Sequence, residues 1–171
     1  LDRIVALCLE REAEFLLIAG DVYDRGYRTT RAQLRFRDAV QTLSEAGIQT
    51  FVVHGNHDPL SATFGAIDWP ETLTVFGSET VETVSLSARD GTPVTVSGIS
   101  YRDSREERRL HRKFPRPDTA GYHIAVLHCS LSTHRGRRAY CECELGELTE
   151  RGFDYWALGH VHTRRILSEQ P

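Results

Sequence analysis

Apolar residues in the first third of the chain follow two spacings, one typical of helices and one typical of buried strands. Over residues 1–13 they recur every three to four positions, which predicts an amphipathic helix. The short continuous run over residues 15–19 predicts a strand buried on both faces of a parallel sheet. A second helix is expected over residues 29–46, followed by a strand over residues 48–53. This alternation indicates an α/β fold, in which a right-handed crossover brings the carboxyl ends of both strands to one sheet edge.

Beyond residue 70 the apolar runs become shorter and more widely spread. Strands are expected over residues 72–76, 81–87 and 93–97, and Asp90-Gly91 suits a hairpin turn between the last two. This meander predicts a second sheet. The remaining expected elements are a charge-dense helix over 102–113, a strand over 122–127, a short helix over 145–151 and a strand over 155–158. We therefore expect a single domain over residues 1–171.

Composition narrows the class of protein. The chain is 40% hydrophobic and 26% charged, as in ordinary globular proteins, and its net charge is −3. A polyanionic partner would therefore have to be held by local patches or by metal ions, because no overall basic field attracts it. No apolar run is long enough to span a membrane and no signal peptide is evident, so we expect a cytoplasmic protein with no membrane partner. The four cysteines have no scaffold or zinc-finger spacing and are expected to be reduced.

Four of the expected strands end in side chains that can bind a metal ion. Each has a simpler explanation by itself, such as a helix cap, a core histidine or an exposed pair of histidines. Their joint appearance at the carboxyl ends of strands, where α/β sheets assemble their sites, predicts one shared centre. The candidates are Asp21 with Asp24, Asn56 with His57, His128, and His160 with His162.

The chemistry of these side chains indicates the kind of centre. Carboxylate, amide and imidazole groups without thiolates suit Mn²⁺, Fe²⁺ or Zn²⁺. A carboxylate that bridges two such ions, about 3.5–4 Å apart, is a device for hydrolysing phosphate esters.

These motifs, in order and over nearly the whole chain, resemble the calcineurin-like metallophosphoesterase family. They are Gly20-Asp21-x-x-Asp24, Gly55-Asn56-His57-Asp58, His128 and Gly159-His160-x-His162. The resemblance implies a four-layer α/β/β/α sandwich, in which two facing mixed sheets are flanked by helices. It also implies two divalent ions, with Mn²⁺ favoured and Fe²⁺, Zn²⁺ or Mg²⁺ as alternatives.

The resemblance further implies a role for each motif residue. Asp21 would bridge the two ions. The ligands of one site would be completed by Asn56, His128 and His160, and His162 would belong to the other site. His57 would contact the scissile phosphate and protonate the leaving oxygen, and Asp58 would set the tautomer of His57. Asp24 and Arg25 would support the loop around the centre.

One motif of the family has no counterpart here. The family opens with Asp-x-His on its first strand, whereas Asp2 is followed by Arg3 and Ile4. We expect the first strand to lie upstream of Leu1 and a C-terminal part to be missing too, so that one metal site is short of ligands. The chain also contains no Met and starts in mid-pattern, as expected of a piece of a longer polypeptide.

Within the family the chain is most similar to SbcD-type DNA-repair exonucleases and their bacterial paralogues. The similarity lies in residues 1–19 followed by Gly20-Asp21, in the segment 98–101 and especially in the segment 154–160, while Asp58 and the pair His160 and His162 distinguish the chain from protein serine/threonine phosphatases. It implies a manganese-dependent exonuclease or endonuclease acting on DNA, with a coiled-coil ABC-type ATPase as partner and a homodimer as a further option. A generic phosphodiesterase, a nucleotide or protein phosphatase and a non-catalytic scaffold remain alternatives.

Two cationic stretches could hold DNA phosphates. The first could equally be a solvated segment balanced by Glu106 and Glu107. The candidate contacts are Arg102, Arg105 and Arg109 in the first stretch and Arg135, Arg137 and Arg138 in the second.

Overall fold

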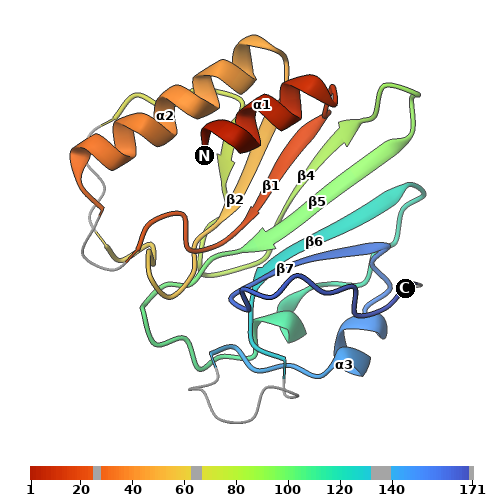
Figure 1. Ribbon diagram of the computed structural model, residues 1–171. Coiled ribbons are helices and arrows are strands. Elements are labelled where there is room, and N and C mark those ends of the chain that lie inside the picture. Colours follow the sequence, from red (N-terminus) through yellow and green to blue (C-terminus); the bar gives the residue numbers. More distant parts are fainter. Residues whose placement is uncertain (25–27, 63–66, 132–139, 170–171) are drawn as a thin grey trace.

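In the computed structural model, residues 1–24, 28–62, 67–131 and 140–169 are described. Two sheets face each other, with α1 and α2 on the outer face of the first and α3 and a 3₁₀ helix on the outer side of the second (Figure 1). The expected sandwich of two sheets flanked by helices is thereby confirmed. The elements are α1 (Asp2–Glu10), β1 (Phe15–Ala19), α2 (Thr30–Glu45), β2 (Gln49–Val53), β3 (Leu73–Val75), β4 (Glu82–Ser87), β5 (Pro93–Ile99), η1 (Leu110–Lys113), β6 (Tyr122–His128), α3 (Leu145–Thr149) and β7 (Tyr155–Gly159).

The first sheet has the order β1-β2-β3, and all its strands are parallel. The prediction that residues 72–76 open the second sheet is wrong, because β3 pairs with β2 and the Phe76 amide donates to the Val52 carbonyl at 3.0 Å. The prediction that residues 15–19 form a parallel strand covered on both faces is confirmed in part. Phe15, Leu17 and Ala19 pack between the sheets, and Leu16 and Ile18 pack on the side of the helices. Because β1 is the end strand of the sheet within the described residues, each of its residues is only partly buried.

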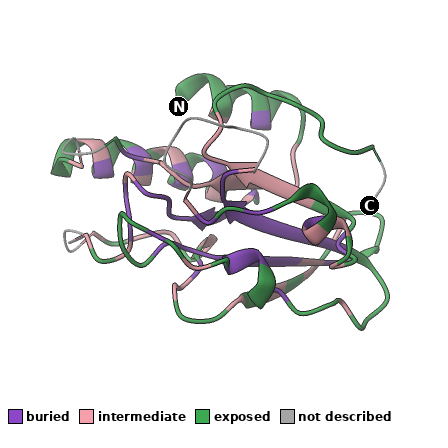
Figure 2. Cartoon of the chain, turned by 90° about the horizontal axis from the view of Figure 1, so that it is seen from below, coloured by how far each residue is buried: buried purple, intermediate pink, exposed green. Residues whose placement is uncertain are grey.

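Alternation along the strands builds the core between the layers. Phe51 and Val53 of β2 pack between the sheets against Val126 of β6. Val52, which points to the opposite face of β2, packs under α2 against Phe36 and Val40. The interior strands are therefore buried, while the outer sides of the helices are exposed (Figure 2).

The second sheet has the order β4-β5-β6-β7. The expected hairpin joins β4 and β5 as antiparallel neighbours, and its turn is closed by the Gly91 amide on the Ala88 carbonyl at 2.9 Å. The strands β5, β6 and β7 are parallel to one another, so their carboxyl ends lie at the same end of the sheet. That arrangement is what positions the candidate site.

The expected helix over residues 102–113 is largely absent, since only η1 is helical in that segment. A helix on a protein surface needs an apolar stripe to pack, and residues 102–109 contain no apolar side chain. Its cations instead bind acidic groups, as in the pairs of Arg108 with Glu106 and Arg112 with Glu147.

Two smaller expectations concern the cysteines and the membrane. All four cysteines are free and buried, as expected of reduced thiols. No helix in the described ranges is both long and apolar enough to cross a bilayer.

Candidate metal centre

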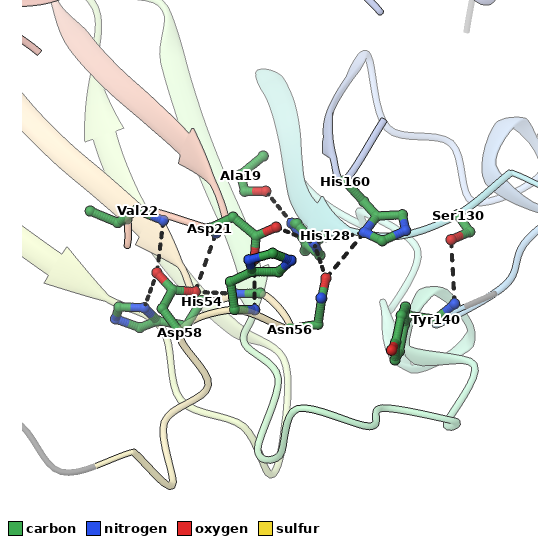
Figure 3. Close-up of polar contacts among 12 residues, drawn as sticks. Ala19, Asp21, Val22, His54, Asn56, Asp58, His128, Ser130, Tyr140 and His160 are labelled. Carbon is green, nitrogen blue, oxygen red and sulfur yellow. Dashed lines mark hydrogen bonds and ion pairs between the residues drawn. The ribbon is translucent and has the colours of Figure 1, made fainter. Parts of the chain in front are cut away.

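Four polar side chains meet where β1, β2, β6 and β7 end. Asp21 follows β1, Asn56 follows β2, His128 is the last residue of β6, and His160 comes directly after β7. Figure 3 shows their polar atoms pointing toward one another, and Asp21, His128 and His160 form a cluster capable of holding a metal ion. The structure thus brings together four of the seven residues that the sequence pattern grouped.

The distances between the donor atoms suit a single divalent ion. Asn56 Oδ1 lies 3.1 Å from both His128 Nε2 and His160 Nδ1. The two nitrogens are 3.2 Å apart, and His128 Nε2 is 3.4 Å from Asp21 Oδ2. Tetrahedral ligands about 2.0–2.1 Å from an ion would be about 3.3 Å from one another. The side chains are therefore close to the spacing that one ion requires.

The protonation of the two histidines also suits a cation. His128 Nδ1 lies 2.8 Å from the Ala19 carbonyl, to which it donates, so a neutral ring directs the lone pair of Nε2 at the centre. Burial lowers the pKa of His128, and burial followed by the charge of His128 lowers the pKa of His160. The Nε2 lone pair of a neutral His128 lies beside the Asp21 carboxylate and the Asn56 amide oxygen, a set of acceptors that can bind a cation.

The backbone is strained at two of these residues. Asp21 has φ +55° and His160 has φ +85°, in the left-handed region that costs non-glycine residues roughly 1–2 kcal/mol. Strain of this kind persists only where surrounding contacts hold it, and it gathers at functional sites.

Two glycines allow the four strand ends to approach one another. A Cβ atom on Gly55 would lie 2.4 Å from Asp21 Oδ1, and one on Gly159 would lie 1.8 Å from the Ala19 carbonyl oxygen. Neither position has space for a side chain, because the strand ends and the His128 ring already fill it.

We expect Gly159→Ala to destabilise the protein by roughly 1–3 kcal/mol, because the methyl group would push β7 away from β1 and disturb the bond between His128 and Ala19. Urea unfolding of both proteins measures the change. Gly146→Ala in α3 is the matched control, since its methyl group would meet no atom within 4 Å. Equal stability of Gly159→Ala and the parent would show that the close approach is not needed.

His57 lies beside the centre and is partly exposed. Its backbone amide donates to Asp21 Oδ1 at 3.0 Å, and its side chain is 37% exposed. Its Nδ1 lies 2.7 Å from Asp24 Oδ1, which leaves the Nε2 side of the ring available to a substrate.

The prediction that Asp58 orients His57 is wrong. Asp58 is buried, and its oxygens accept from the amides of Gly55 and Val22 at 2.8 and 2.7 Å, while His54 Nδ1 lies 3.0 Å away. Burial would raise the pKa of Asp58, but the hydrogen bonds from His54 and the two amides outweigh it and hold that pKa below its usual value. The buried carboxylate satisfies the loop amides, and Asp24 takes the position beside His57.

Other predicted site residues lie elsewhere or outside the described ranges. His162 is exposed and does not belong to the three-residue cluster of Asp21, His128 and His160. Arg105 is exposed, whereas Arg102 and Arg109 pair with Glu79 and Glu147, each at 3.4 Å. The residues outside the described ranges are Arg25, Arg135, Arg137 and Arg138.

Sequence reasoning missed three residues around the centre. His54 contacts Asp58, and a polar residue at the end of a buried strand was the available signal. Tyr101 packs edge-on against the His128 ring, with the ring centres 5.3 Å apart. Tyr140 packs likewise against His160, with the ring centres 5.7 Å apart (Figure 3). Nothing in the local sequence distinguishes these tyrosines from core residues.

Comparison with known proteins gives a consistent result. The family model described as calcineurin-like phosphoesterase matches residues 1–164. The uncharacterized metallophosphoesterase YhaO of Bacillus subtilis is 33% identical over 98% of this chain and 41% of its own length. The DNA double-strand break repair protein Mre11 of Thermoplasma acidophilum is 27% identical over 92% of this chain and 43% of its own length. Mre11 of Sulfurisphaera tokodaii is 25% identical over 96% of this chain and 42% of its own length. The chain thus spans about two-fifths of the length of these relatives.

Proposed function

The chain belongs to the calcineurin-like phosphoesterase family, and on that premise we propose that it is a phosphodiester-hydrolysing nuclease that acts on DNA with Mn²⁺. Hydrolysis dependent on divalent metal follows from the family itself. The main support for the proposal is the four-donor centre, formed by Asp21, Asn56, His128 and His160, with His57 beside it. The choice of DNA is supported by the similarity to Mre11 proteins over more than nine-tenths of this chain.

The side chains of the centre have separate tasks. Asp21, Asn56, His128 and His160 would hold a divalent ion, which supplies Lewis acidity to the phosphoryl oxygens and the attacking water. Asp24 keeps a proton on Nδ1 of His57 and stabilises the ring when it is charged. The Nε2 atom of His57 can then donate a proton to the leaving oxygen.

A phosphodiesterase without preference for DNA is the second candidate. The observation that favours it is the pairing of Arg102 and Arg109 with acidic side chains, which reduces the positive charge available to DNA phosphates.

Hydrolysis of linear duplex DNA and of bis(p-nitrophenyl) phosphate by the same preparation separates the candidates. We expect both substrates to be cleaved with Mn²⁺, though slowly because one of the two metal sites is short of ligands, and neither to be cleaved with EDTA. Both activities should be lost together in His57→Ala. Cleavage of the small diester without cleavage of DNA would refute the nuclease and favour the general phosphodiesterase. Failure on both substrates would refute catalysis by this chain.

A further inference from the structure

We propose that His54 is a positioning residue of the metal centre, which acts by holding Asp58 and, through it, the strained loop that carries Asp21. The inference rests on the proposed metal centre and concerns a residue that does not itself face the ion. Its premise is the contact at 3.0 Å between His54 Nδ1 and Asp58 Oδ2 (Figure 3).

The Asp58 carboxylate joins the loops that follow β1 and β2. Its Oδ1 accepts from the amides of Asp21 at 3.2 Å and Gly55 at 2.8 Å. Its Oδ2 accepts from the amide of Val22 at 2.7 Å and faces the His54 ring. A shift of this one carboxylate would therefore move the backbone of Asp21 and the start of the segment that carries Asn56.

The His54 ring is held in place through its backbone. Its backbone amide donates to the Ser100 hydroxyl at 2.9 Å, and its carbonyl accepts from the Tyr101 amide at 2.9 Å. Ser100 and Tyr101 directly follow β5, so the anchor belongs to the second sheet. His54 and Asp58 are both almost fully buried, at 2% and 1% exposed, so water does not replace this contact.

The left-handed backbone at Asp21 benefits from such an anchor. Aspartate tolerates this region better than most residues, but the helical or extended region is still more favourable unless contacts hold the residue. The Asp58 carboxylate holds the amide, and the His57 amide holds Oδ1. Loss of the His54 contact would leave Asp58 held by the loop amides alone, so Oδ2 of Asp21 would be held less firmly at 3.4 Å from His128 Nε2.

Replacing His54 tests this through metal affinity. His54→Phe keeps the ring volume and removes the donor, whereas His54→Asn keeps an N–H group close to the position of Nδ1. By calorimetry we expect His54→Phe to bind Mn²⁺ about 10- to 100-fold more weakly than the parent, and His54→Asn to recover most of that loss.

The matched control is His123→Phe, which replaces another buried histidine that bonds Thr95 and the Thr119 carbonyl at the opposite end of β6. It should change thermal stability without changing Mn²⁺ affinity. A purely structural role for His54 predicts that His54→Phe behaves in the same way, and that result would overturn the proposal.

Three further outcomes are decisive. Should His54→Phe fail to fold, Ser100→Ala removes the hydroxyl that holds the His54 amide, and unchanged Mn²⁺ affinity in that variant would refute the proposal. If the parent chain bound no Mn²⁺, the metal centre itself would be refuted, and with it the premise of this inference. Weaker binding in both His54→Phe and Ser100→Ala, with recovery in His54→Asn, would support it.

Discussion

Replacing His57 with alanine is expected to lower turnover about 10²- to 10⁴-fold while leaving Mn²⁺ affinity nearly unchanged, because the change removes proton transfer rather than a ligand. The ring lies beside the centre and is 37% exposed, and its Nδ1 is bound to Asp24. Its contact with the centre is the backbone amide that donates to Asp21 Oδ1, and alanine keeps that amide. Hydrolysis of bis(p-nitrophenyl) phosphate measures turnover, and calorimetry measures Mn²⁺ binding.

Asp24→Asn is the companion variant, since it keeps the shape of the side chain and removes the charge beside His57. We expect a smaller loss of turnover than in His57→Ala, again with metal affinity unchanged. An equal loss of Mn²⁺ binding in His57→Ala would show that His57 is a ligand or supports the fold, and the proposed proton donor would have to be sought elsewhere.

The second large effect is expected from His128→Asn, which should weaken Mn²⁺ binding more than about 100-fold and abolish hydrolysis, since a direct ligand is lost rather than one of its supports. The shorter amide can still donate to the Ala19 carbonyl, as Nδ1 does now, but it cannot reach the position of Nε2. That nitrogen is within 3.4 Å of donor atoms from Asp21, Asn56 and His160.

His162→Ala is the comparison for this experiment, because the exposed side chain of His162 lies outside the cluster. We expect it to leave the tight binding of Mn²⁺ intact, and the parent to saturate at one equivalent. Equal weakening by both substitutions would contradict the four-donor centre. Tight binding of a second equivalent would reveal ligands beyond the described residues.

Much of the architecture could be predicted because it depends on local patterns. The continuous apolar runs of β1 and β2, with a helix between them, require parallel strands whose carboxyl ends share an edge. The same argument places the residues after β6 and β7 at that edge. The prediction of a helix over residues 102–109 was wrong, because a charged segment without an apolar stripe has no face with which a helix could pack on the core.

The sequence by itself determined which side chains reach the common edge, since strand direction and chain order leave Asp21, Asn56, His128 and His160 nowhere else to lie. Only the tertiary structure decided which partner each group takes. The sequence indicated Asp58 as the partner of His57, but the loop amides and His54 compete for Asp58 and bury it, and Asp24 lies beside His57 instead. The spacing of residues along the chain cannot show which carboxylate will pair with His57. Buried backbone amides need hydrogen-bond acceptors, and the positions of these amides are set only when both loops fold against the second sheet.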